Sequence, residues 1–507
     1  MKGQETNATC TKPGITCSLQ RVYHEKGARL LTVKAETAIK YIDQKRDFLT
    51  GLSDKVWEFA ELALHEEKSA DVLIEALQPE GFAIEKGVGG IPTAFVATWG
   101  SGKPCIGFLG EYDALAGVSQ KPVPERDPVV INGPGHGCGH NLLGVGALGA
   151  AIALKQELTA KELPGTIKYF GCPAEENLSG KAFMARDGVF DGCDACLTWH
   201  AGALNRVRNG SSLANNAINV TFYGRTAHAA GDPYNGRSAL DAVQLANLGV
   251  EFLREHMPPA ARVHYVITNG GLMPNVVPAE AKVWYLIRAP RREHVDELYE
   301  RVLDCVHGAA RMTGTEPKIE LIKAIYNVLN NTVLENVLDA AMNRVGPTKF
   351  TTEEKQFAKK IMESVPEKQK IAFLQRELFT PEEYRILKEA VLNETVLKQC
   401  AVFKEGNGST DVGDVSWCAP TAQFSTACQA VGTPGHSWQY CAQAGMSIGH
   451  EGMLKAAEVL AEAGFELMTH PEILEAAKKE FDERREGRAY RSAMPPDQKP
   501  AFHQFAE

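Results

Sequence analysis

The sequence predicts an α/β protein with a mixed, mostly parallel sheet, into which a smaller α+β unit is inserted. Over residues 91–200, short apolar runs of β type alternate with helical patterns, which is typical of a parallel sheet. Over residues 216–327 the order becomes strand, helix, strand, strand, helix, strand, which is a split β-α-β-β-α-β unit. A chain of 507 residues is also longer than one core normally supports. We therefore expect more than one domain.

The first part of the α/β domain opens with a helical pattern over 36–77, where apolar residues recur three and four positions apart. Strands are expected at 91–100, 104–115, 165–176 and 195–200, and a helix at 141–158. Polar residues stand at the ends of several of these strands. In open α/β sheets ligands bind outside the carboxyl ends of the strands, so the functional site is expected there.

The inserted unit is expected to contain strands at 216–224, 262–270, 280–290 and 317–327, with helices at 238–256 and 293–312. A segment rich in Lys and Glu follows, in which Thr380, Pro381 and Glu383 have the spacing of a capping box at a helix start. We interpret this segment as a solvated helical insertion. The predicted divisions are a disordered or irregular extension (1–35), the first part of the α/β domain (36–213), the inserted unit (214–326), the helical insertion (327–400), and the second part of the α/β domain with a C-terminal arm (401–507).

Composition and charge exclude several classes of protein. The net charge of −9, from 54 basic and 63 acidic residues, argues against a nucleic-acid partner. Apolar runs are short or broken by charge, so no membrane span is expected. The N-terminus lacks the apolar core of a signal peptide, and the twelve cysteines are scattered. A cytoplasmic protein is therefore expected.

The stretch GPGHGCGHNLLG, residues 133–144, places Cys138 and His140 two positions apart between glycines. Thiolate and imidazole are common ligands of zinc-like ions, and residues two apart in an extended turn point to the same side. The spacing alone is also compatible with a glycine-rich turn that buries a thiol. The motif therefore needs further ligands from elsewhere in the chain.

Other strand ends supply such candidates. CPAEE provides the adjacent carboxylates Glu175 and Glu176, TWH provides His200, and GTPGHSWQ provides His436. The plausible ligands are then Cys138, His140, Glu176, His200 and His436, which are too many for one tetrahedral ion and enough for two divalent ions. Glu175 is the natural general base beside them. Each residue alone has a structural interpretation, and a pair such as Glu66 and Glu67 is interpreted as solvated.

Eight motifs in order resemble the amidohydrolase branch of metallopeptidase family 20, which includes aminoacylase and the glutamate carboxypeptidases. They are GEYDAL, GHGCGHNLLG, GCPAEENLSGKAFMARDGVF, LTWH, GRTAHAA, NVVPAEAKVWYLIRA, GSTDVGDVSW and HSWQ followed by GMSIGHEGML. The likeness covers about residues 39–468, and within the branch it looks strongest to the aminobenzoyl-glutamate hydrolases. It implies a zinc-peptidase-like domain with two divalent ions, zinc or manganese, and an inserted lid that forms a dimer interface. The expected partner is a second copy or a related subunit.

The resemblance implies a role for each motif residue. The five candidates named above would be the metal ligands, and Glu175 the general base. Asp113 would orient a ligand histidine, and His228 of the lid would reach the partner's active site and stabilise an oxyanion. Asn275 and Arg288 would hold the substrate carboxylate. The implied reaction is hydrolysis of the amide bond of an N-acyl or N-aroyl amino acid, with an aminobenzoyl-glutamate-like substrate favoured.

Two questions stay open at this point. Glu111 occupies the position at which other branches of the family carry a metal-binding histidine, and the sequence does not say whether it contacts an ion. The alternatives for function are a dipeptidase acting on β-alanyl or similar dipeptides, and a non-catalytic metal-binding subunit of a heteromeric hydrolase. Glu175 argues against the non-catalytic subunit, since a structural site needs no spare base beside its ligands. A purely structural zinc domain predicts a closed site of four ligands, and the five candidate ligands disfavour it.

Overall fold

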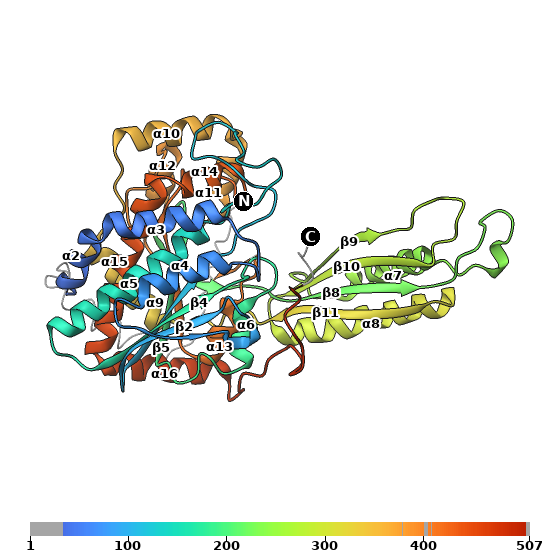
Figure 1. Ribbon diagram of the computed structural model, residues 1–507, viewed down its shortest axis with the longest axis horizontal. Helices are drawn as coiled ribbons and strands as arrows, with labels where there is room; N and C mark the ends of the chain where they lie inside the picture. The colour runs from blue at the N-terminus through green and yellow to red at the C-terminus, as the bar shows by residue number, and fades with distance from the viewer. Residues whose placement is uncertain (1–33, 378, 400–403, 407, 503–507) are drawn as a thin grey trace, which may run out of the picture.

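The computed structural model describes residues 34–502 except 378, 400–403 and 407, and it contains two main sheets (Figure 1). The larger sheet has the strand order β1-β2-β4-β3-β5-β13-β6. Its four central strands are mutually parallel: β4 (Gly165–Cys172), β3 (Cys105–Glu111), β5 (Ala195–Gly202) and β13 (Thr421–Ala427). The outer strands β1 (Ala83–Lys86), β2 (Phe95–Ser101) and β6 (Arg206–Arg208) run antiparallel to their neighbours. The predicted mixed, mostly parallel sheet is therefore confirmed.

Helices cover both faces of this sheet. The larger core includes residues of α2 (Glu36–Gln44), α3 (Arg46–Phe59), α4 (Glu67–Leu77), α5 (His140–Ala160), α9 (Thr332–Val345), α15 (Ser447–Thr469) and α16 (Pro471–Arg485). The core on the other face includes residues of α6 (Gly180–Arg186) and α13 (Val412–Cys418). A sheet covered on both faces explains why its central strands are apolar runs without polar alternation.

The central helix α5 is built almost entirely from small and apolar residues. A Cβ at Gly144 would lie 2.6 Å from the carbonyl oxygen of Glu111, so only glycine lets α5 approach the end of β3 this closely. In the described part of the chain, α5 is the one helix with the length and composition of a membrane span, and 83% of its apolar 18-residue stretch is buried in the fold. That burial is typical of a core helix. The close packing brings His140, the first residue of α5, to the end of β3.

The lid is the inserted unit, and its sheet has the order β11-β8-β10-β9 with all neighbours antiparallel. Its elements follow the predicted order: β8 (Ala214–Tyr223), α7 (Ala239–Leu253), β9 (Arg262–Asn269), β10 (Glu280–Ala289), α8 (Arg292–Thr313) and β11 (Glu316–Ile325). Both helices pack on one face around a separate core. In Figure 1 the lid projects away from the larger domain, with the loops after β8 and β9 at its far end.

The segment after the lid is helical, as predicted, but the interpretation of the whole segment as solvated was wrong. Its first helix, α9, packs against α15 and β13 in the main core. The helices α10 (Thr352–Glu363), α11 (Glu367–Arg376) and α12 (Pro381–Glu389) lie near α14 (Trp438–Ala444) at one end of the molecule (Figure 1). The predicted capping box is confirmed: Glu383 N donates to Thr380 Oγ1 at 3.2 Å, and Thr380 N donates to Glu383 Oε2 at 2.8 Å. The predicted domain limits stay predictions, and residues 1–33 of the expected extension lie outside the described residues.

Candidate metal centre

The candidate site lies at the carboxyl ends of the parallel strands, as the sequence predicted. β3 ends at Glu111, and the chain after β4 leads to Glu175 and Glu176. His200 lies near the end of β5, and His436 follows β13 in a loop. The N–H group of His436 donates to the carbonyl of Gly137 at 3.1 Å, which ties this loop to the Cys138–His140 motif.

The structure brings the five predicted ligands together, along with Glu111 and Glu175. Three overlapping groups have ligand atoms within 4.8 Å of one another: Cys138, His140 and His200; Cys138, Glu176 and His436; and Glu111, His140 and Glu175. The Sγ of Cys138 lies 3.5 Å from His200 Nε2, and His436 Nε2 lies 3.4 Å from Glu176 Oε2. A sulfur, nitrogen and oxygen donor set of this kind suits zinc, and it also accommodates manganese.

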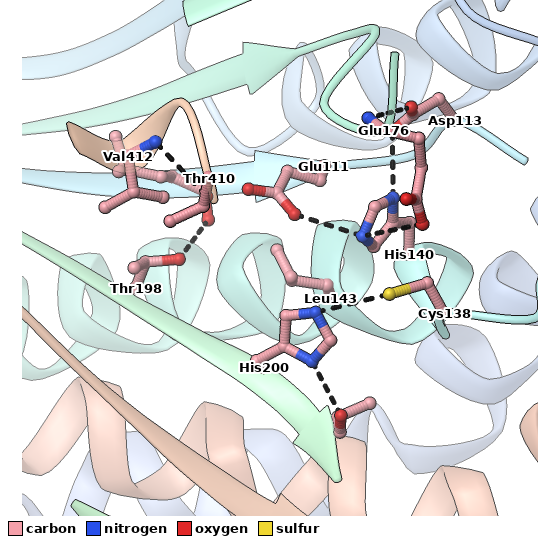
Figure 2. Close-up of polar contacts among 12 residues, drawn as sticks. Glu111, Asp113, Cys138, His140, Leu143, Glu176, Thr198, His200, Thr410 and Val412 are labelled. Carbon is pink, nitrogen blue, oxygen red and sulfur yellow. Dashed lines mark hydrogen bonds and ion pairs between the residues drawn. The ribbon is translucent and has the colours of Figure 1, made fainter. Parts of the chain in front are cut away.

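Asp113 fixes the orientation of His140 (Figure 2). Its Oδ1 lies 2.8 Å from His140 Nδ1, and its Oδ2 accepts a hydrogen bond from Glu176 N at 2.9 Å. Burial alone would raise the pKa of Asp113, but the charge and hydrogen bond of His140 outweigh it and lower that pKa. Asp113 is therefore ionised and holds Nδ1, which leaves Nε2 of His140 facing the other candidate ligands.

Unpaired polar atoms test whether a cation fits this cluster. Within the described part of the chain, His140 Nε2 and Glu176 Oε1 are buried and have no hydrogen-bond partner. His140 Nε2 lies 3.3 Å from Glu111 Oε2 and 3.9 Å from Glu176 Oε1, so these atoms converge without hydrogen bonds, and a cation among them would satisfy all three. Burial lowers the pKa of His200 well below its usual value, and its Nδ1 is 2.7 Å from the Ala201 carbonyl. His200 is thus neutral with Nε2 available, which is the form that binds metal.

Glu66 corrects one interpretation from the sequence. Glu67 is exposed, but Glu66 is fully buried and adds another acid to the region beneath the site. It accepts hydrogen bonds from Ala174 N at 2.8 Å and from Thr93 Oγ1 at 3.1 Å. Ala174 has a φ of 62°, a strained conformation for a residue with a side chain. The prediction that Glu66 is solvated was wrong because Glu66 holds this strained turn immediately before Glu175, a long-range contact that its local sequence does not encode.

Sequence reasoning also missed Lys181 and Asp411, which lie beside Glu111. All three side chains are buried, and Lys181 Nζ lies 2.7 Å from Glu111 Oε1 and 2.6 Å from Asp411 Oδ1. Burial alone would lower the pKa of Lys181, but Asp411 and Glu111 raise it well above its usual value. The available signal was a single lysine in the apolar segment GKAFMA, since a buried lysine needs charged partners.

The lid residues predicted for the site fall into two groups. His228 and Asn275 are exposed and lie in the loops after β8 and β9, where Ala229 N donates to the Asn275 carbonyl at 3.0 Å. They are not part of the ligand cluster of their own chain. Arg288 lies near the end of β10, on the face of the lid sheet that packs toward the α/β domain through Leu286 and Ala217. Its Nε is buried without a hydrogen-bond partner in the described residues.

Lys323 lies on the same face of the lid sheet as Arg288. Lys323 pairs with Ala217 of β8, and Arg288 pairs with Asn215, which is two positions away on the same strand. Burial lowers the pKa of both side chains, and the charges of Glu175 and Asp411 oppose this effect at Lys323. Lys181 and Arg292 each pair with an acidic side chain, whereas no such ion pair joins Arg288 or Lys323 to another described residue. The base of the lid therefore presents two partly buried cations without a salt bridge, and one of them, Lys323, lies within the electrostatic influence of Glu175 in the candidate site.

Comparisons with known proteins agree with this architecture. Residues 215–311, within the lid, match the family model described as a peptidase dimerisation domain. The chain is 42% identical over 467 residues to a p-aminobenzoyl-glutamate hydrolase subunit of Escherichia coli strain K12, covering 91% of this chain and 97% of that protein. It is 29% identical to the mouse Xaa-Arg dipeptidase, covering 88% and 91%.

A solved structure shares the fold. It is a Bacillus subtilis protein described as a dinuclear metal-binding peptidase of the M20 family, with a TM-score of 0.53 and 16% identity over 84% of this chain and 99% of that one. With the ligand cluster, the dimerisation domain and the near full-length relative, the predicted enzyme class is confirmed. The chain belongs to the M20 family of metallopeptidases and amidohydrolases.

Proposed function

We propose that this protein hydrolyses the amide bond of N-acyl or N-aroyl amino acids in a metal-dependent reaction, with a p-aminobenzoyl-glutamate-like substrate favoured. The observation that carries the proposal is Glu175 standing next to a cluster of sulfur, nitrogen and oxygen ligands. A site with only a structural role would not need a further carboxylate beside its ligands. The name of the Escherichia coli relative supports the choice of substrate.

Cys138, His140, Glu176, His200 and His436 would hold two divalent ions, zinc or manganese. When bound, such ions polarise a carbonyl group and lower the pKa of water. Glu175 would take the proton of the attacking water and return it to the leaving nitrogen. Burial and the neighbouring charge of Glu111 raise the pKa of Glu175, which moves it toward the range a general base and acid needs near neutral pH.

The two cations at the base of the lid support a substrate that carries negative charge on its amino-acid side. Arg288 would hold the α-carboxylate, which a guanidinium binds through two parallel hydrogen bonds. Lys323 lies on the same face of the sheet and would interact with a second carboxylate. A glutamyl or aspartyl leaving group fits this arrangement better than a neutral or basic one.

A dimer completes the proposed site. The edge strand β9 exposes Tyr265, Val266 and Ile267, and the following loop exposes Leu272, which is 97% accessible. Exposed apolar residues on an unpaired strand edge are typical of a surface that pairs with another chain. His228 and Asn275 would then act in the partner's site, with His228 stabilising an oxyanion. The partner is a second copy or a related subunit, and the described cysteines are free thiols, which supports a cytoplasmic location.

The test is a substrate panel for the purified, metal-loaded protein. It should contain p-aminobenzoyl-glutamate, p-aminobenzoyl-alanine, other N-acyl amino acids, and β-alanyl dipeptides. Release of glutamate from the first compound, lost after chelation, is the expected result. Cleavage of dipeptides alone would replace the proposal with a dipeptidase. Metal binding without hydrolysis of any compound, also after mixing with a related subunit, would indicate the non-catalytic alternative.

A further inference from the structure

The buried cluster of Lys181, Glu111 and Asp411 joins three segments that lie far apart in the sequence. Glu111 ends β3, Lys181 is the second residue of α6, and Asp411 precedes α13. Lys181 is held in place twice by Asp411, because its N–H group donates to Oδ2 at 2.9 Å and its Nζ lies 2.6 Å from Oδ1. The lysine therefore has little freedom to leave this position.

The two oxygens of Glu111 have different surroundings. Oε1 lies 2.7 Å from Lys181 Nζ, whereas Oε2 lies 3.3 Å from His140 Nε2 (Figure 2). Both oxygens of Asp411 are occupied by Lys181. The cluster thus leaves one oxygen of Glu111 directed at a predicted metal ligand.

The side chains of Glu111 and His140 meet at a point where further acidic groups converge. Asp113 Oδ1 lies 2.8 Å from His140 Nδ1, so Nε2 is the ring nitrogen directed at the other candidate ligands. Glu111 Oε2 lies 3.3 Å from this Nε2, and the ligand atoms of Glu111, His140 and Glu175 all lie within 4.8 Å of one another. Two ligands that are each about 2.0–2.2 Å from one ion lie roughly 3 Å apart, which matches this spacing.

We propose that Glu111 is an additional ligand of the metal centre and that Lys181 is its positioning residue. This inference rests on the proposed function, because it concerns the divalent ion that His140 helps to hold. Lys181 acts by fixing Oε1, so that the carboxylate cannot turn both oxygens toward Asp411 or solvent. A divalent ion at this point would be held by Glu111 at the end of β3 and His140 at the start of α5, with Glu175 beside them.

The experiment measures metal binding without substrate. Chelator-treated wild type, Glu111→Gln and Lys181→Met are titrated with Mn²⁺ and with Zn²⁺ by calorimetry, and bound metal is counted after dialysis. We expect one of the two ions to bind about 10–100-fold more weakly in both variants. The double variant should bind that ion no more weakly than Glu111→Gln alone, because Lys181 acts through Glu111.

Two controls separate positioning from general damage. Arg344→Met removes another buried cation that lies between two carboxylates, away from the ligand cluster. This variant should bind both ions as the wild type does. If Lys181→Met does not fold, Glu111→Gln, which preserves shape, still decides whether Glu111 is a ligand. Wild-type affinity and stoichiometry in Glu111→Gln would overturn the inference while leaving the proposed function intact. Failure of the wild type to bind any metal would overturn the proposed function itself.

Discussion

Two buried clusters in the α/β domain each place one cation between two carboxylates, and they are organised differently. One joins α9 to α15, where Arg344 Nε lies 2.5 Å from Glu462 Oε1 and Nη2 contacts Glu466 Oε2. The remaining oxygens are also used: Glu462 Oε2 accepts from Ala35 N at 2.8 Å, and Glu466 Oε1 pairs with Lys34. Every carboxylate oxygen of this cluster is satisfied within the fold.

The cluster around Lys181 leaves Oε2 of Glu111 directed at His140, and a buried nitrogen without a hydrogen-bond partner lies there. Both clusters bury charge at similar depth, so burial does not separate a structural ion cluster from a functional one. The difference lies in the carboxylate oxygens, since Arg344 also buries an Nη1 without a hydrogen-bond partner. A cluster whose carboxylate oxygens are all used by donors of the fold stabilises the fold, whereas one that directs an oxygen at a predicted metal ligand is arranged for an ion.

The largest expected effect is on the Arg344 cluster, in which every carboxylate oxygen is used within the fold. Arg344→Met leaves two buried carboxylates without their cation, which should cost about 3–5 kcal/mol of unfolding free energy. Urea unfolding of the chelated protein measures this loss. A variant that loses metal affinity in proportion to its stability would contradict the distinction between the two clusters.

Asp113→Asn tests the metal-binding region through the carboxylate that orients His140. The amide no longer fixes the Nδ1–H tautomer of His140, so the affinity for metal should fall about 10–100-fold while the fold is retained. Calorimetric titration with Mn²⁺ measures the change, and circular dichroism checks the fold. Asp497→Asn, the same substitution at an exposed position, is the matched control and should leave the affinity for metal unchanged.

The pH dependence of metal binding follows from Glu176. In the metal-free protein, burial raises the pKa of Glu176 to about 8, so that the side chain is protonated below this pH. Metal binding must displace that proton, and it must also remove the proton of the Cys138 thiol, whose pKa burial raises. The apparent affinity should therefore rise with pH by at least about tenfold per unit below about pH 8. Titration in buffers of different ionisation enthalpy measures the proton release. Affinity that is constant between about pH 6 and 8 would contradict protonation of Glu176 in the metal-free state.

The base of the lid offers the opposite case, because its side chains without an ion-pair partner are cations. Lys323→Met tests one of them. Loss of an interaction with a second carboxylate should raise KM for p-aminobenzoyl-glutamate about tenfold and leave KM for p-aminobenzoyl-alanine unchanged. Steady-state kinetics with both substrates measures the ratio. Equal changes for the two compounds would assign Lys323 a structural role.

The smallest effect is expected at the capping box of α12, which lies outside the candidate site. Thr380→Ala removes the side-chain acceptor of the capping box at α12, which should cost about 1 kcal/mol of stability. Thermal unfolding measures it, and Thr380→Ser should restore most of the loss. Metal affinity and kcat should stay at their wild-type values.

Local sequence patterns predict much of the fold and part of the candidate site. Strand ends, helix starts and the spacing of Cys138 and His140 are encoded within a few residues, and each placed its side chain at the predicted edge of the sheet. Glu66 and Lys181 could not be predicted in that way, because their partners Ala174 and Asp411 are more than a hundred residues distant. A buried charge is explained by what surrounds it in space, which short sequence patterns do not contain.

The central claim is tested most directly by Glu175→Gln in the metal-loaded protein with p-aminobenzoyl-glutamate as substrate. The variant keeps the ligands and loses the base, so both ions should remain bound while kcat falls about 10²–10⁴-fold. Metal counting and glutamate release are measured on the same sample, with chelated wild type as the inactive reference. A variant that binds both ions and hydrolyses the substrate at the wild-type rate would contradict the role of Glu175 and the mechanism built on it.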